Sequence, residues 1–349
     1  TKIDNALRGG IGAPDIFLGE IAYVKDFIDK DYWVDLSSKE FGAEELARNQ
    51  IQYATDLGRD NKGALRALTF QATPGALFYR RSLAKVYFGT DDPVIIGKST
   101  GNIDSYLNMA QTIYEKSNGE VSLVASYQDI GRPVLNSRKE PWIVNNKIQL
   151  EDELVDFIDQ AKELVDSAMI STKSQWSENW FTSMGDGSVF SFILPTWGIN
   201  ALLKPNSNGS SGDWAMTTPP FNYFWGGSWF GISKTCENKK LAWDIIKYFA
   251  SDREQLTSLA KGGEFVNRVD IIEEVLPTIS EPFLGGQNHF EYFYEEAKKI
   301  DAGNVGRYDE QIAIAYWSSI DLYLNGNISR DEVEEHFKST VRSLIPGVE

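Results

Sequence analysis

Short apolar runs alternate along the chain with longer segments of helical periodicity, and this alternation constrains the fold most. Residues 75–80 and 189–194 are typical of buried strands, and a proline closes the second run. Residues 102–117 and 154–168 place apolar side chains at the spacing of amphipathic helices. Because strands that alternate with helices form a sheet covered by helices, the sequence predicts an α/β fold.

Further elements follow from local patterns. A capping box at Ser329 and Glu332 predicts the start of the last helix, and Thr235 is expected to cap the helix that follows it. The remaining expected strands are residues 13–18, 64–70, 121–126, 214–219 and 228–233, and the remaining expected helices are residues 44–55, 238–250 and 309–324.

Chain length, charge and residue counts narrow the class of protein to which this sequence can belong. A chain of 349 residues predicts two domains at roughly 100–200 residues each. Its 50 acidic and 34 basic residues give a net charge of −16, which repels phosphate backbones and argues against nucleic-acid binding. The sequence has no run of about 18 apolar residues to span a membrane. The single cysteine, Cys236, and two histidines exclude an intrachain disulfide and a His/Cys zinc site, and we expect no cofactor.

Residues 321–332 match part of a calcium-binding EF-hand loop. Asp321, Gly326 and Glu332 stand at its first, sixth and twelfth positions. Tyr323 stands at the third position, where the loop needs a carboxylate or amide oxygen. A helix end followed by a capping box explains the same residues, so we favour that interpretation over a metal site.

Aromatic residues are the unusual part of the composition, since the chain holds 10 Trp, 15 Tyr and 19 Phe. The most informative block, residues 224–233, reads Phe-Trp-Gly-Gly-Ser-Trp-Phe-Gly-Ile-Ser. Its paired glycines permit a positive φ and the close approach of another group to the backbone. Its indoles either pack in a core or present flat faces to a ligand. These residues by themselves leave a core hairpin and a ligand-lined hinge equally open.

Four stretches carry a resemblance to a known family. Residues 12–18 read Gly-Ala-Pro-Asp-Ile-Phe-Leu, and residues 67–81 include Phe-Gln-Ala-Thr-Pro-Gly-Ala. Residues 185–197 run from Gly-Asp-Gly through a strand to a Thr-Trp pair, and residues 225–249 join the Trp-Gly-Gly-Ser-Trp block to a helix. In this order and spacing they resemble the extracellular solute-binding proteins of family 1, the maltose-binding-like group that delivers sugars to ABC importers.

The resemblance implies a two-lobed, type II periplasmic-binding-protein-like α/β fold with the ligand in the cleft between its lobes. Several hinge crossings would join residues 1–71 plus 227–284 as the first lobe and residues 72–226 plus 285–349 as the second. Family members normally begin with a strand–helix–strand unit ahead of the Pro-Asp strand. We expect the first lobe to lack that unit here, because residues upstream lie outside this sequence or because the lobe is incomplete.

The resemblance also implies a ligand site. Indole faces would pack on the C–H surfaces of a sugar, and carboxylate and amide groups would bind its hydroxyls. Trp176, Trp180, Trp214 and Trp243 are assigned to packing. The residues expected at the site are Trp197, Trp225 and Trp229 as ring faces, Glu20, Gln71 and Glu264 as hydrogen-bonding groups, and Gly226 and Gly227 at the hinge.

The implied function is capture of a carbohydrate for ABC transporter permease subunits by a monomeric, non-enzymatic protein. The implied location is the periplasm or the cell exterior, with a lipid anchor as one form. Two alternatives stay open. A glycoside hydrolase shares a Trp-rich cleft but needs two carboxylates at a fixed separation. A binder of the same fold for another solute, such as a polyamine, would need several carboxylates around its aromatic rings.

Overall fold

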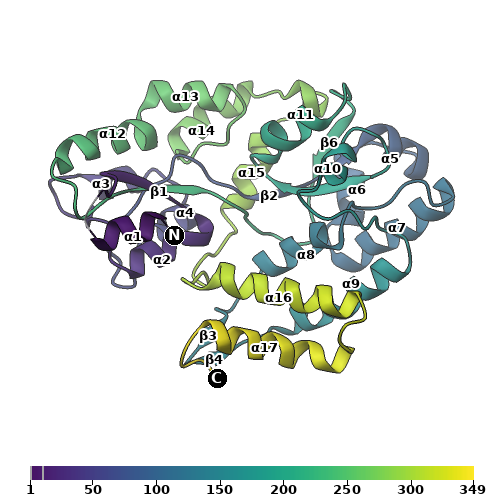
Figure 1. Ribbon diagram of the computed structural model, residues 1–349. Coiled ribbons are helices and arrows are strands. Elements are labelled where there is room, and N and C mark those ends of the chain that lie inside the picture. The colour runs from purple at the N-terminus through teal and green to yellow at the C-terminus, as the bar shows by residue number, and fades with distance from the viewer. Residues whose placement is uncertain (1, 10–11) are drawn as a thin grey trace. The chain divides into compact units, whose positions relative to one another are not determined.

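The computed structural model describes residues 2–9 and 12–349, and the chain divides into two compact units (Figure 1). Each unit is built from segments that are far apart in the sequence. Unit 1 comprises Thr1–Thr73, Gly226–Thr278 and Ala297–Glu310, and unit 2 comprises Pro74–Trp225, Ile279–Glu296 and Gln311–Glu349. The lobe boundaries drawn from the resemblance stay a prediction.

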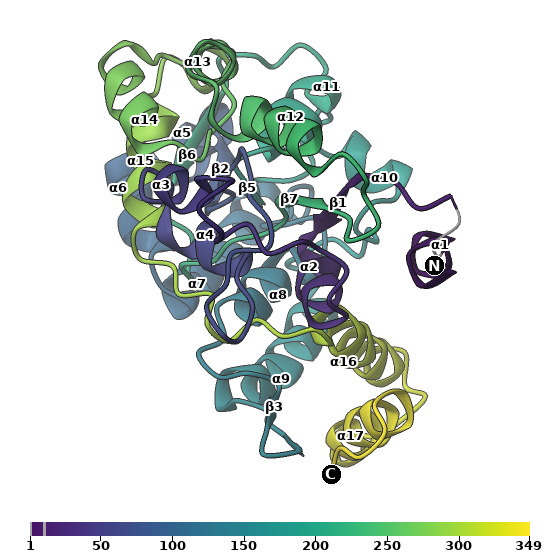
Figure 2. The same cartoon turned by 90° about the vertical axis from the view of Figure 1, so that its left-hand side faces the viewer.

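Unit 1 contains a two-stranded antiparallel sheet. Strand β1 (Ile16–Glu20) pairs with β7 (Ser228–Ile232), and helix α2 (Ile21–Asp29) lies beside both strands (Figure 2). The buried Trp33 ring packs under this sheet, and a Cβ at Gly231 would lie 2.3 Å from it. Glycine is therefore required at position 231 for the ring to approach the strand. The other elements of unit 1 are α1 (Lys2–Gly9), α3 (Ala43–Ala47), α4 (Gln52–Leu57), α12 (Lys239–Ser251), α13 (Arg253–Lys261), α14 (Val269–Val275) and η2 (Leu276–Thr278).

Unit 2 contains a three-stranded antiparallel sheet in the order β5-β2-β6. The central strand, β2 (Gly75–Arg80), lies between β5 (Ser191–Pro195) and β6 (Trp214–Thr217). All but one of the β2 residues are buried, which explains its continuous apolar run.

Helices surround this sheet, and α16 and α17 lie side by side in unit 2 (Figures 1 and 2). The helical segments are α5 (Arg81–Phe88), α6 (Pro93–Thr100), α7 (Ile103–Ser117), α8 (Tyr127–Asn136), α9 (Asp152–Asp166), α10 (Glu178–Thr182), η1 (Ile199–Leu203), α11 (Lys204–Asn206), η3 (Pro282–Leu284), α15 (His289–Ala297), α16 (Asp309–Leu324), η4 (Arg330–Glu332) and α17 (Val333–Leu344). A short hairpin joins β3 (Ile143–Val144) to β4 (Lys147–Ile148).

The α/β class and several elements predicted from local patterns are confirmed. Helix α16 has the expected bounds, and α7 begins after Asn102, whose side chain accepts a hydrogen bond from Ser105. The capping box of Ser329 and Glu332 forms as predicted and opens η4, which leads into α17. No helix in the described part of the chain is long and apolar enough to cross a membrane.

Two expected strands are wrong. Residues 64–70 and 121–126 form only isolated bridges, through Leu65, Leu68 and Ser122. Leu68 exchanges two backbone hydrogen bonds with Phe230 of β7, but the backbone groups before it pair with loops. The backbone N–H of Ala67, for example, donates to the Gly58 carbonyl oxygen. An apolar run alone therefore does not specify a strand, because the partner backbone must also be there to pair with it.

The expected helix 44–55 is also wrong, since it is two helices, α3 and α4. The backbone N–H of Ile51 donates to Asn267 Oδ1 at 2.8 Å, outside the helical hydrogen-bond pattern. The predicted cap at Thr235 is wrong as well. Asn238 caps α12 by accepting from Leu241, while the Thr235 hydroxyl pairs with Ser233.

Candidate functional site

Three indoles from separate segments of unit 2 form a group that we call the indole cluster: Trp176, Trp197 and Trp225. The Trp176 and Trp197 rings stack with centroids 6.2 Å apart and planes 17° apart. Trp225 meets Trp197 at 5.4 Å and Trp176 at 5.8 Å, edge to face in both cases. Trp176 is 48% exposed, and the other two rings are half-buried. The cluster thus exposes aromatic surface that is not buried in the core.

Hydrogen bonds hold the Trp197 ring and the backbone beside Trp225. Trp197 follows β5, and its Nε1–H donates to the Trp225 carbonyl oxygen at 3.0 Å. Asn136, at the end of α8, donates to the carbonyl oxygen of Phe224 at 2.9 Å. The first bond holds the Trp197 ring, and both bonds hold the backbone that carries Trp225.

Arg132 of α8 lies against the cluster. Its guanidinium carbon is 5.2 Å from the Trp225 ring centroid and 5.8 Å from that of Trp317. Both distances are within the range of a cation–π interaction. The guanidinium therefore adds N–H donors and positive charge beside otherwise apolar rings.

Trp176 is held by a strained turn ahead of α10. Its φ of 70° is left-handed, which costs a residue with a Cβ about 1–2 kcal/mol. The fully buried Trp180 ring lies 5.5 Å below it, and Phe181 meets it edge to face at 6.2 Å. Strain of this kind persists only where surrounding contacts enforce it, so the position of Trp176 depends on its supports.

The start of α2 in unit 1 carries a carboxylate that lies beside the glycine pair. Glu20 is exposed and caps the helix, because its Oε2 accepts from the Ala22 backbone N–H at 2.8 Å. The Ile21 N–H donates to the Gly227 carbonyl oxygen at 3.2 Å. The β1–β7 pairing therefore brings Glu20 next to the glycine pair.

Gln71 and Glu264 come together in the same unit. Gln71 forms an antiparallel bridge with Val266, and the Ala72 N–H donates to the Phe265 carbonyl oxygen at 3.3 Å. Glu264 directly precedes that segment, and both predicted side chains are half-buried. The structure thus places each of these two polar residues on facing backbone segments of unit 1.

The glycine pair and Trp229 form a packed arrangement. Gly226 and Gly227 have φ of 85° and 108°, and Thr73 Oγ1 donates to the Gly226 carbonyl oxygen at 3.1 Å. Trp229 is only 1% exposed, and its Nε1–H donates to the Ala54 carbonyl oxygen at 2.8 Å. In this structure Trp229 therefore supports the glycine pair from beneath and presents no ring face to solvent.

Two members of the candidate site were missed from the sequence. The sequence patterns assign Trp176 to packing and give Arg132 no role, yet both residues lie in or against the indole cluster. The close spacing of Trp176, Trp180 and Phe181 was the available signal for Trp176. Arg132 had no such signal, because its neighbour Trp225 is far away in the sequence.

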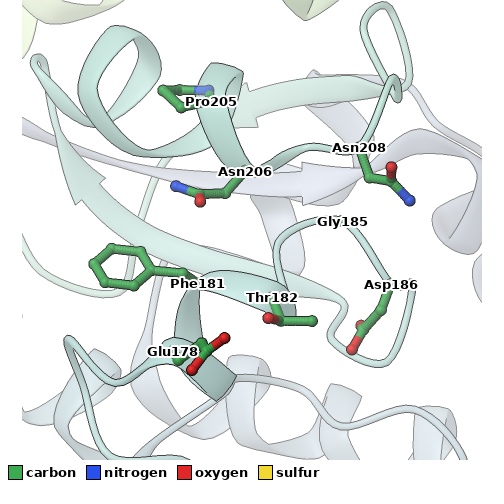
Figure 3. Close-up of a pocket in the computed structure, with 8 residues that line it drawn as sticks. All are labelled: Glu178, Phe181, Thr182, Gly185, Asp186, Pro205, Asn206 and Asn208. Carbon is green, nitrogen blue, oxygen red and sulfur yellow. The ribbon is translucent and has the colours of Figure 1, made fainter.

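A pocket of about 580 Å³ adjoins the indole cluster in unit 2 through Phe181 (Figure 3). Figure 3 shows Asn206 and Asn208 across from Thr182 and Asp186. Carboxylate, amide and hydroxyl groups thus line one pocket together with an aromatic ring. The lining residues are Glu178, Phe181, Thr182, Gly185, Asp186, Pro205, Asn206 and Asn208.

The EF-hand-like segment serves other contacts. Asp321 lies within α16, and one of its carboxylate oxygens accepts from the Tyr127 hydroxyl at 2.6 Å. Glu332 binds Ser329 in the capping box. Within residues 2–9 and 12–349, no group of three or more His, Cys, Asp or Glu residues is placed to hold a metal ion.

Known structures share this architecture. A crystal structure described as extracellular solute-binding protein family 1 matches with a TM-score of 0.86 at 19% identity, covering 98% of this chain and 88% of that chain. An ABC transporter associated binding protein from B. animalis subsp. lactis matches with a TM-score of 0.77 at 21% identity, covering 99% and 87%. The GacH receptor of Streptomyces glaucescens matches with a TM-score of 0.78 at 19% identity, covering 100% and 88%.

These likenesses confirm the predicted two-lobed, periplasmic-binding-protein-like α/β fold. The sequence shows family membership in addition to the shared fold. Residues 1–267 match the family described as bacterial extracellular solute-binding protein, and this match spans more than half of the chain. With its fold, its motif order and this match in agreement, the chain belongs to the family of bacterial extracellular solute-binding proteins.

Proposed function

We propose that this protein captures a sugar or oligosaccharide at the indole cluster and delivers it to an ABC importer. The observation that carries the proposal is the grouping of Trp176, Trp197 and Trp225 with aromatic surface left exposed. Flat indole faces complement the C–H faces of a pyranose ring, and the Arg132 guanidinium supplies donors for hydroxyl oxygens. A few convergent polar groups among aromatic rings are typical of small-molecule sites.

The ligands of related structures support a carbohydrate. The B. animalis protein was solved in complex with beta-1,6-galactobiose, and the S. glaucescens receptor in complex with acarbose. A galacto-N-biose-/lacto-N-biose I-binding protein from Bifidobacterium longum, with a TM-score of 0.76 at 16% identity, was solved in complex with lacto-N-biose. We therefore choose these sugars as the first probes.

The proposal keeps Glu20, Gln71 and Glu264 as the hydrogen-bonding residues of unit 1. A carboxylate makes stronger hydrogen bonds than a neutral amide, so Glu20 should contribute more per contact than Gln71. Gly226 and Gly227 follow directly on the unit boundary after Trp225, and their positive φ values suit a hinge. Trp229 becomes the support beneath that hinge.

Family membership implies a periplasmic or extracellular location. We propose that the protein acts there as a monomer, with or without a lipid anchor, and hands the bound sugar to permease subunits. The family and its structural neighbours are binding proteins, and we propose that the sugar is released unchanged. Incubation with oligosaccharides followed by chromatography tests this last point, since hydrolysis products would favour a glycosidase.

A thermal-shift screen tests the proposed ligand class. A sugar at one hundred times its Kd stabilises the folded state by about 2.7 kcal/mol and so raises Tm. The panel contains beta-1,6-galactobiose, lacto-N-biose, acarbose, maltose, glucose and galactose. Trp197→Ala should abolish the shift, whereas Tyr248→Ala, an exposed aromatic of unit 1, should retain it. A panel with no shift, alongside a shift with spermidine or a metal salt, would assign the site to another solute.

A further inference from the structure

A buried carboxylate lies beneath the indole cluster. Asp129 of α8 is 1% exposed. Its Oδ1 accepts from Trp180 Nε1 at 3.0 Å and from Gln175 Nε2 at 3.1 Å. Its Oδ2 accepts from the Ser126 backbone N–H at 3.0 Å, which completes the capping box of α8. One carboxylate thus ties the start of α8 to the segment that carries Trp176.

All of these partners are donors. An ionised carboxylate can accept every one of them, because it has only acceptor positions. A protonated carboxyl must point its O–H at one of the donors and so give up that hydrogen bond. Burial raises the pKa of Asp129 to about 7, against the opposing effect of the Trp180 and Gln175 hydrogen bonds. The group therefore changes its hydrogen bonding near neutral pH.

The two side-chain donors lead directly to the indole cluster. Gln175 precedes Trp176, whose left-handed backbone needs outside support. Trp180 carries the ring on which Trp176 rests, with centroids 5.5 Å apart. Loss of either hydrogen bond to Asp129 would remove a constraint on the turn, so that Trp176 could relax away from Trp197.

Two phenols face Asp129, and neither of them ionises in this pH range. The phenols of Tyr106 on α7 and Tyr223 ahead of Phe224 face it, and burial raises the pKa of both well above the ordinary value. Lys173 donates to Ser188 at 2.9 Å. The Arg132 guanidinium, one turn further along α8, lies over the Trp225 ring.

We propose that Asp129 is a positioning residue for the Trp176 ring, so that the indole cluster binds sugar while Asp129 is ionised and loosens when it takes up a proton. The inference has two parts: the structural arm concerns the Trp176 turn, and the ligand arm concerns sugar affinity. The ligand arm rests on the proposed function. The structural arm does not, because it concerns the Trp176 turn in the ligand-free protein.

The structural arm is measured first. Acrylamide quenching of tryptophan fluorescence is recorded from about pH 5.5 to about pH 8.5, and the contribution of Trp176 is isolated by difference against Trp176→Phe. Wild type should show a transition with a midpoint near 7, with greater quenching on the acid side. Asp129→Asn should abolish the transition. The control Asp186→Asn, which removes an exposed carboxylate of the same unit, should retain it.

The ligand arm uses the panel sugar that gives the largest thermal shift. Its Kd is measured by isothermal titration calorimetry at about pH 6 and about pH 8, and one lost charge-assisted hydrogen bond predicts about tenfold weaker binding at the lower pH. Gln175→Ala removes one of the two links between Asp129 and the turn without altering Asp129, while Trp180 keeps the other, so its Kd should differ less between the two pH values than the Kd of wild type does. This variant decides the question if Asp129→Asn fails to fold.

Each outcome is decisive. A flat quenching profile in wild type, or a wild-type profile in both Asp129→Asn and Gln175→Ala, overturns the role of Asp129. Sugar binding that is equal at both pH values in wild type overturns it as well. If no panel sugar binds at either pH while the quenching transition is present and depends on Asp129, the proposed function fails and the positioning role stands.

Discussion

Replacing Gly227 by alanine tests the packing beneath the glycine pair. Gly227 has a φ of 108°, where L-residues are rarely found, and a Cβ there would lie 2.8 Å from the Trp229 ring. Trp229 cannot move away without breaking its hydrogen bond to the Ala54 carbonyl oxygen. Backbone strain and steric overlap therefore both oppose the substitution.

The expected magnitude is the sum of these two effects. Strain at a sparsely populated φ costs about 1–3 kcal/mol, and an added methyl group in a packed interior costs about 1–3 kcal/mol. We expect Gly227→Ala to lower the free energy of unfolding by about 4 kcal/mol. Gly63→Ala is the matched control in unit 1, because its φ is 83° but no described heavy atom lies within 4 Å of an added Cβ. It should show the strain alone, about 2 kcal/mol.

Urea unfolding followed by far-UV circular dichroism measures both variants. A second-site change, Trp229→Phe in the Gly227→Ala background, shortens the ring that the methyl group meets and should recover part of the loss. Equal losses for Gly227→Ala and Gly63→Ala would show that Trp229 does not crowd this position, and the reasoning would be refuted.

Three further predictions concern single side chains. Asp129 has a higher pKa in the folded state than in the unfolded chain, so its carboxyl loses its proton first in the unfolded chain. Between about pH 4 and about pH 7 the free energy of unfolding should therefore fall as pH rises. At about 1.4 kcal/mol per pKa unit, the fall amounts to up to about 4 kcal/mol. Urea titrations across this range check it, and an equally steep fall in Asp129→Asn would contradict it. Asn267→Ala leaves the buried Ile51 N–H without its acceptor and should lower the free energy of unfolding by about 2 kcal/mol in the same assay. A change within experimental error would mean that the break between α3 and α4 needs no side-chain support. Trp176→Ala removes an exposed ring and should weaken sugar binding about tenfold by calorimetry with little loss of Tm; unchanged affinity would take Trp176 out of the site.

The sequence by itself determined the features that depend on near neighbours. The capping box of Ser329 and Glu332, the start of α7 after Asn102 and the bounds of α16 were all predictable. In each case the partners are a few residues apart, so that every conformation of the chain that forms the helix also forms the contact. The order of the Pro-Asp, Gln-Ala-Thr-Pro and Trp-Gly-Gly stretches likewise predicted the family, because the spacing between motifs is itself a property of the sequence.

Only the tertiary structure decided which side chains meet. Ile51 leaves the helical pattern because Asn267, distant in the sequence, binds its N–H. Trp229 is buried and Trp176 is exposed, although both lie in similar aromatic stretches of the sequence. Burial depends on what the fold places against each ring. The indole cluster joins three segments separated by loops and by β5 and β6. Contacts of this kind are set by the packing of whole elements, and no local pattern encodes them.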